Sequence, residues 1–202
     1  MSKSQDSRIL LIVDPQIDFI NGSLPVTGAE EAMNKLAHYV REHGSEYGKI
    51  IVTADRHGFG HCSFKENGGP WPRHCVESSV GAAIWPALMD ALQLNASNLV
   101  MLYKGEKDDR EEYSIFCNPS AAQVIDNMMF AKDGSANTES KQIDICGLAG
   151  DVCVADTLED AIKRYPTARF SILQAFTASL DSGARLSTIE NSSNNISVII
   201  DC

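Results

Sequence analysis

Short apolar runs alternate with amphipathic stretches along this chain. The clearest run, residues 8–13, reads Arg-Ile-Leu-Leu-Ile-Val, a pattern typical of a strand buried on both faces of a parallel sheet. Stretches with apolar residues three and four positions apart predict helices between such runs. The predicted strands are 8–13, 49–54, 98–103, 142–146, 169–175 and 196–201. The predicted helices are 29–42, 83–92, 118–130, a segment that begins near Cys153, and 182–190.

This alternation of strands and helices predicts the fold class. It indicates a three-layer α/β/α fold with a mainly parallel sheet. The chain has 202 residues, the length of one domain, and contains no internal repeat, low-complexity segment or linker. We therefore expect a single domain over residues 1–202.

Composition narrows the class of partner and the compartment. The net charge is −10 and no Lys/Arg cluster occurs, which argues against nucleic acid or an anionic membrane as a partner. The polar N-terminus lacks the apolar core of a signal peptide, and no apolar run is long enough to span a bilayer. The six cysteines include no C-x-x-C pair, so we expect reduced thiols in a cytoplasmic protein.

A glycine-containing turn joins the fourth predicted strand to a helix and carries Cys153 at its end. The segment reads Gly-Leu-Ala-Gly-Asp-Val-Cys-Val over residues 147–154. Free N–H groups and the positive dipole end at a helix N-terminus lower the pKa of a thiol, and the thiolate is the nucleophile. The simpler alternative is a small buried cysteine that only packs in the first turn of the helix.

Reactive groups follow four of the predicted strands. They are Asp14, Asp55, Lys104 and Cys153. Ligands of open α/β sheets bind beyond the carboxyl ends of the strands, so the fold would bring these groups to one rim. A strand-end Asp alone is usually a turn or cap residue and a strand-end Lys is usually solvated. Together they form a nucleophilic set in which Lys104 stabilises the thiolate and Asp14 carries its proton.

A second group of residues suits a metal ion. Asp55, His57, His61 and His74 offer one carboxylate and three imidazoles, which fits a divalent transition metal such as zinc, iron or manganese. One alternative is a loop of solvated histidines. Another is a structural zinc site that also uses a neighbouring cysteine, either Cys62 or Cys75.

The remaining candidates lie in long loops. Phe19 and Trp71 could sandwich a flat ring, although aromatic residues alone favour ordinary core or loop packing. The charged run 106–112 is most simply a solvated loop, after which residues 113–116 fold back inward. Residues 132–141 are polar and read as a surface connection.

Five motifs, in order and at matching spacings, carry a family resemblance. They are Asp-x-Gln-x-Asp-Phe from Asp14, Asp-x-His from Asp55, Trp-Pro-x-His-Cys-Val from Trp71, Lys-Gly from Lys104, and Gly-Leu-Ala-x-Asp-x-Cys-Val from Gly147. From about Ile9 to Thr177 the chain resembles the nicotinamidase branch of the isochorismatase-like cysteine hydrolases. The resemblance implies a six-stranded parallel sheet in the order 3-2-1-4-5-6, flanked by helices.

The resemblance also implies a function and a role for each matching residue. The activity would be a metal-dependent hydrolysis of nicotinamide to nicotinate and ammonia through a cysteine thioester, with a small-molecule amide as substrate. One divalent ion per chain is implied, with zinc expected first and iron or manganese as alternatives, and a homo-oligomer is possible. The implied residues are Cys153 as nucleophile, Asp14 as proton shuttle, Lys104 as third catalytic member, Asp55, His57, His61 and His74 as metal ligands, Phe19, Trp71 and Tyr113 around the ring, and the amides of Ala149 and Cys153 as oxyanion hole. The bond before Ala149 would be a cis peptide.

The chain departs from the family pattern at several positions. Gly150 stands where the family usually has Thr, which predicts a looser turn, and Ile17 stands where a polar residue is common. The segments 106–112 and 132–141 could reshape the entrance of the pocket. These departures bear on substrate range, so another amide or carbamoyl hydrolase of the superfamily remains an alternative. A non-enzymatic thiol redox sensor or metal store would use the same residues.

Overall fold

The computed structural model describes residues 7–130, 141–181, 183–192 and 195–200. Its centre is a six-stranded sheet in the order β3-β2-β1-β4-β5-β6, in which every paired strand is parallel. The strands are β1 Arg8–Val13, β2 Lys49–Asp55, β3 Leu99–Lys104, β4 Gln142–Gly147, β5 Arg169–Thr177 and β6 Ile196–Ile199. This confirms the predicted fold class and strand order.

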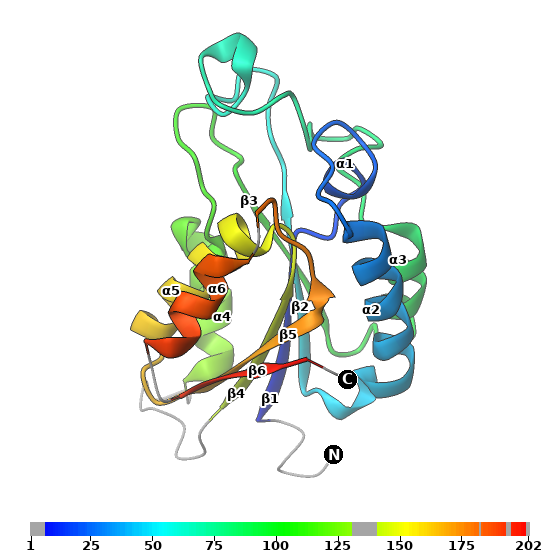
Figure 1. Ribbon diagram of the computed structural model, residues 1–202, viewed down its shortest axis with the longest axis vertical. Coiled ribbons are helices and arrows are strands. Elements are labelled where there is room, and N and C mark those ends of the chain that lie inside the picture. The colour runs from blue at the N-terminus through cyan, green and yellow to red at the C-terminus, as the bar shows by residue number, and fades with distance from the viewer. Residues whose placement is uncertain (1–6, 131–140, 182, 193–194, 201–202) are drawn as a thin grey trace.

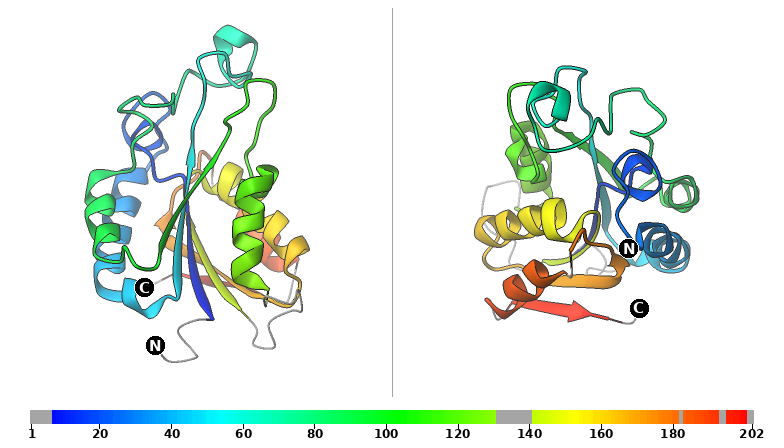
Figure 2. Two further views of the ribbon diagram at one scale, coloured as in Figure 1. Left: turned by 180° about the vertical axis from the view of Figure 1, so that it is seen from behind. Right: turned by 45° about the horizontal axis from the view of Figure 1, so that its top comes forward.

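Helices cover both faces of this sheet (Figures 1 and 2). The α-helices are α1 Ile17–Ile20, α2 Ala29–His43, α3 Pro86–Gln93, α4 Pro119–Met129, α5 Ala155–Arg164 and α6 Ala184–Asn191. Leu10 and Ile12 of β1 face the α2 and α3 side, whereas Ile9, Leu11 and Val13 face the α4 and α5 side. Because successive side chains of a strand point to opposite faces, one apolar run supplies two cores.

The predicted elements agree with the structure apart from their ends. The helix expected from residue 83 begins at Pro86, since a proline is favoured at the first helical position. Strand β5 continues to Thr177, two residues beyond the predicted end. The predicted connection 132–141, the helix start at residue 182 and the strand end at residue 201 fall largely or wholly outside the described residues.

The carboxyl ends of the strands all lie at one edge of the sheet, which sets the place of the site (Figure 1). Strand β1 pairs with β2 on one side and with β4 on the other, so the chain order reverses there. Such a reversal point is where open α/β sheets bind ligands. Among the helices in the described parts of the chain, none has the length and apolarity needed to cross a membrane.

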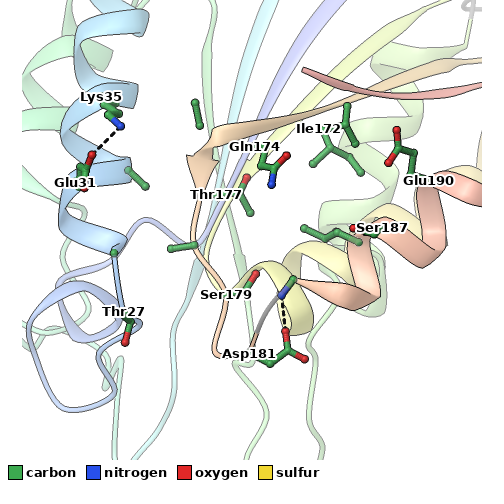
Figure 3. Close-up of a pocket in the computed structure, with 17 residues that line it drawn as sticks. Thr27, Glu31, Lys35, Ile172, Gln174, Thr177, Ser179, Asp181, Ser187 and Glu190 are labelled. Carbon is green, nitrogen blue, oxygen red and sulfur yellow. Dashed lines mark hydrogen bonds and ion pairs between the residues drawn. The ribbon is translucent and has the colours of Figure 1, made fainter. Parts of the chain in front are cut away.

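A separate groove of about 480 Å³ lies between α2 and α6 and is lined in part by residues of strand β5 (Figure 3). Its walls are largely polar and include Glu31, Lys35, Gln174, Ser187 and Glu190. Lys35 and Glu31 form an ion pair of 2.7 Å across one turn of α2. The described residues that line this groove do not include Asp14, Asp55, Lys104 or Cys153, which were predicted to be reactive.

Candidate active site

Asp14 directly follows strand β1 in a strained backbone conformation. Its φ is +47°, in the left-handed region that few residues other than Gly, Asn and Asp occupy. The carboxyl is fully buried, and its Oδ1 accepts a hydrogen bond of 2.7 Å from the hydroxyl of Thr53 on β2. A buried carboxylate at the reversal point is thus fixed in one orientation.

Lys104 joins the predicted catalytic residues to the predicted metal ligands. The side chain is fully buried at the end of β3. Its Nζ lies 2.8 Å from Asp14 Oδ2 and 2.6 Å from Asp55 Oδ1, and donates to Cys153 Sγ at 3.6 Å. Although burial alone lowers the pKa of Lys104, the two carboxylates outweigh it and raise that pKa well above its ordinary value. Lys104 therefore stays charged.

Cys153 reaches the rim through an irregular turn after β4. The Leu148–Ala149 peptide is cis, as the family resemblance implies. A π-helical turn over Gly150–Val154 follows, and α5 begins only at Ala155. Cys153 therefore lies in this π-helical turn, two residues before the regular helix that was predicted to begin near it. The thiol still lies beside the buried carboxylates, because ligand atoms of Asp14, Asp55 and Cys153 all lie within 4.8 Å of one another.

Two glycines allow this turn to approach its neighbours closely. Gly147 has a φ of +121°, and a Cβ there would lie 2.1 Å from the carbonyl oxygen of Val13. At Gly150 a Cβ would lie 2.4 Å from Ser179 Oγ. The segment after β5 leaves no room for a side chain at Gly150, whereas a looser turn at this residue stays a prediction.

Burial has the largest effect on the pKa values of the predicted catalytic residues Cys153 and Asp14. Burial raises the pKa of the Cys153 thiol well above its usual range, although the Lys104 ammonium opposes this. The expectation of a lowered thiol pKa is therefore not met. Burial likewise raises the pKa of Asp14, against the effect of Lys104, and so makes its carboxylate a stronger base. A proton shared between Cys153 and Asp14 suits this arrangement.

The turn also offers a donor for a developing negative charge. Within the described part of the chain, the Ala149 N–H donates to no acceptor, whereas the next amide, Gly150 N–H, donates to Ala178 O at 2.8 Å. An unpaired amide beside a nucleophile can hold an oxyanion. Ala149 and Cys153 both line the pocket, as the predicted oxyanion hole requires.

Each of the three predicted histidine ligands has its Nδ1 held by an oxygen atom. The partners are Gly105 O for His57 at 2.8 Å, Ser63 Oγ for His61 at 2.7 Å and Pro72 O for His74 at 2.8 Å. A carbonyl oxygen can only accept, so Nδ1 of His57 and of His74 donates and leaves Nε2 with the lone pair that binds metals. Nδ1 of His61 also accepts a hydrogen bond of 3.3 Å from the Ser63 N–H. In the described chain, Nε2 of His57 and of His61 is buried without a hydrogen-bond partner. The residues therefore fit a cation.

The four predicted metal ligands do not all converge equally. Ligand atoms of Asp55, His57 and His74 lie within 4.8 Å of one another and are buried. His61 is also buried, and its ring stacks on that of His57 at 3.9 Å between centroids. Burial lowers the pKa of His74, and burial with the neighbouring His57 lowers that of His61 to about 4. These two imidazoles are thus neutral and able to bind a metal near neutral pH.

The predicted aromatic residues line one pocket with the thiol. Phe19, Trp71 and Tyr113 surround it, and the Trp71 indole N–H donates to the Tyr113 hydroxyl at 3.0 Å. The Phe19 ring also lies 5.5 Å from the ring of His74. Sequence reasoning missed the other lining residues, which are Leu24, Val26, Glu111, Val152 and Leu180.

Sequence reasoning also missed the role of Gln16. It is fully buried, and its Oε1 accepts from the Asp55 N–H at 2.8 Å. Its Nε2 donates to the carbonyl oxygens of Asp55 at 2.8 Å and Ala82 at 2.9 Å. Its place in the first motif was the signal that could have identified it. Gln16 holds the backbone of Asp55, a predicted metal ligand, in place.

The charged run 106–112 is only partly the solvated loop that was expected. Residues 106–110 are exposed, but Glu111 is half-buried and Glu112 is buried. Glu112 Oε2 accepts from the Gly105 N–H at 2.8 Å, and Asp108 O accepts from the Cys62 N–H at 2.9 Å. The segment therefore packs on the loop that carries the histidines.

Comparison with known proteins assigns the family. The model of the isochorismatase domain matches residues 8–164. The nicotinamidase/pyrazinamidase of Mycobacterium tuberculosis is 29% identical over 187 residues, 91% of this chain and 92% of that protein. The pyrazinamidase of Pyrococcus horikoshii in complex with zinc has a TM-score of 0.76 at 28% identity, covering 96% of this chain and 99% of that one. PnC1 from L. infantum in complex with nicotinate has a TM-score of 0.78 at 26% identity, covering 98% and 95%. The chain belongs to the isochorismatase family.

Proposed function

We propose that this protein is a nicotinamidase, which hydrolyses nicotinamide to nicotinate and ammonia. The observation that carries the proposal is the buried Lys104 ammonium, which contacts Asp14, Asp55 and Cys153 and so joins the nucleophile to the ligand cluster. The relatives support the substrate, since they include a nicotinamidase/pyrazinamidase and a complex with nicotinate. The aromatic pocket next to the thiol suits a flat ring.

In the first half-reaction, sulfur attacks the carboxamide carbon. Asp14 takes the Cys153 proton as the C–S bond forms, and the amides of Ala149 and Cys153 hold the negative charge that develops on oxygen. Asp14 then gives the proton to the departing nitrogen, which leaves as ammonia. The product of this step is a thioester on Cys153.

In the second half-reaction, water hydrolyses the thioester. Asp14, again ionised, accepts a proton from water as the oxygen attacks the same carbon, and returns one to the thiolate as the C–S bond breaks. Lys104 keeps its charge throughout and stabilises the anionic forms of both partners. One water is consumed for each ammonia and acid released.

One divalent ion would be held by Asp55, His57 and His74, together with His61, which stacks on His57. Zinc is the ion we propose first, with iron and manganese as alternatives, because the zinc complex of a family member supports it. When bound, the ion would supply a positive point that binds the ring nitrogen and so orients the carboxamide. The side chains that orient the ring plane are Phe19 and Trp71.

The test is ammonia release from nicotinamide by the purified protein, with a Cys153→Ala variant beside it. The variant should lose about 10³-fold or more of the activity, the scale seen when a nucleophile is removed. Cys117→Ala is the matched control, since Cys117 is an exposed thiol. More than a tenth of wild-type activity in Cys153→Ala would exclude this thiol as the nucleophile.

The thiol redox sensor is the alternative from another class, and burial argues against it. Cys153 is only 6% exposed and its pKa is raised, whereas sensor cysteines are accessible and of low pKa. A metal store would not need the pocket of aromatic residues beside the thiol.

Ring recognition gives a further test. Benzamide has the amide and the ring shape of nicotinamide but lacks the ring nitrogen. A site built around a polar contact rejects an analogue without it, so benzamide should be hydrolysed about 10²-fold more slowly than nicotinamide or pyrazinamide. Steady-state rates for the three amides measure this. Equal rates for benzamide and nicotinamide would remove the ring-nitrogen contact but leave the Cys153 amidase.

We also propose that residues 1–202 act as one domain in the cytoplasm and that the protein can form a homo-oligomer. The family match over residues 8–164 and the single sheet support one domain. Light scattering during size-exclusion chromatography would measure the molar mass of the protein in solution and so test whether it forms a homo-oligomer.

A further inference from the structure

Glu111 places a carboxylate in the wall of the substrate pocket. It lines this pocket together with Asp55, Trp71, Tyr113 and Cys153, and its side chain is half-buried. The cation of the site, Lys104, already pairs with Asp14 and Asp55. The negative charge of Glu111 is therefore not neutralised by Lys104, which already pairs with two other carboxylates.

The 106–112 segment holds Glu111 in this position. One of its carboxylate oxygens accepts a hydrogen bond of 3.1 Å from the Glu112 N–H. The Glu112 carboxylate is in turn fixed by the Gly105 N–H at 2.8 Å. On the other side, Asp108 packs so closely on Gly58 and Gly60 that a Cβ on either would lie 2.6 Å from its carboxylate. Glu111 thus belongs to an anchored part of the pocket wall.

We propose that Glu111 is a specificity-determining residue that makes the pocket favour neutral ring amides over anionic ring acids. This inference rests on the proposed function, in which hydrolysis turns a neutral amide into a carboxylate in the same pocket. The charge of Glu111 repels the acid but not the amide. It therefore promotes release of the product and limits inhibition by it. At the effective dielectric constant of such sites, one like charge lowers the affinity of an anion by about tenfold.

The test measures binding of nicotinate and nicotinamide by calorimetry to the metal-loaded Cys153→Ala protein, with and without Glu111→Gln. Burial raises the pKa of Glu111, with Asp55 adding to the rise, so the titrations are made at about pH 8 to keep the carboxyl ionised. Glu111→Gln should bind nicotinate about tenfold more tightly, while the affinity for nicotinamide changes by less than about twofold.

Asp109→Asn is the matched control, because it removes one charge from the same segment at a side chain that is 82% exposed. It should leave both affinities unchanged. Glu111→Ala provides a second variant should Glu111→Gln fail to fold, and it should show the same preference. An equal change for both ligands, or no change for nicotinate, would overturn the inference. Failure of the wild-type protein to release ammonia would instead overturn the proposed function, since the binding comparison does not depend on turnover.

Discussion

Gln16 touches neither thiol nor ring, but it binds both polar backbone atoms of Asp55. Gln16→Leu should leave these buried groups without partners and lower the free energy of unfolding by about 2–4 kcal/mol. It should also release Asp55 from its fixed orientation and weaken zinc binding by about 10- to 100-fold, as loss of a supporting contact commonly does. Denaturant unfolding and competition with a chelator measure the two effects.

Gln93→Leu is the control for this substitution, because Gln93 is exposed at the end of α3. It should change neither unfolding nor zinc binding. Normal zinc affinity in a destabilised Gln16→Leu protein would assign Gln16 a role in folding alone.

Residues at the ends of strands could be predicted, whereas residues that hold them could not. Asp14, Lys104 and Cys153 each follow an apolar run, and parallel topology brings such positions to one edge. Gln16 and Glu111 act through backbone atoms and a pocket wall formed by distant parts of the chain. No hydrophobic pattern encodes those contacts. The first motif could have pointed to Gln16, but the structure was needed to show what Gln16 and Glu111 contact.

An ion pair between Asp126 and Arg164 joins helices α4 and α5, and its contribution to stability can be tested. Asp126 of α4 accepts from Arg164 Nε at 2.7 Å and from the Tyr165 hydroxyl at 2.8 Å. The hydrogen bond from Arg164 lowers the pKa of Asp126, with Tyr165 adding to this. A carboxyl with a lowered folded-state pKa stabilises the protein above its unfolded-state pKa, and this contribution is lost as pH falls through the folded-state pKa.

Asp126→Asn should therefore destabilise the protein at pH 7 by about 1 kcal/mol, a modest value because the Arg164 side chain is 41% exposed. The difference from wild type should shrink below about pH 4 as the carboxyl takes up a proton. Urea unfolding of both proteins at several pH values measures it. A difference that is independent of pH would mean that the charge contributes nothing.

The elements themselves were predicted well where their periodicity was long. Helix α2 agrees closely with its predicted range because it buries one regular set of apolar residues, and β1 does so because its continuous apolar run is buried on both faces. The turn over Gly150–Val154 was not predicted as π-helical. Its shape depends on contacts of Gly147 with β1 and of Gly150 with Ser179, which are tertiary contacts.

At the scale of the molecule, the two cores lie on the faces of the sheet and the proposed ligands lie at its rim. Chelation should therefore abolish amide hydrolysis while the protein keeps its secondary structure, and added zinc should restore activity. The melting temperature should fall only by the amount expected for loss of a bound ligand. Activity, circular dichroism and thermal melting before and after chelation measure this. Loss of the circular dichroism signal on chelation would favour the structural zinc site instead.

The position of β1 at the reversal point has a consequence for synthesis. Arg8 lies opposite Gln142, so β1 gains its second neighbour only after the roughly 130 residues between these two positions have been made. Strands β1 to β3 carry Asp14, Asp55 and Lys104 and can pair earlier, whereas the thiol arrives with β4. Pairings so distant in sequence form slowly and leave strand edges exposed meanwhile. Asp14, Asp55 and Lys104 are thus synthesised before Cys153, and a growing chain would lack the proposed nucleophile until β4 and the turn after it have been made.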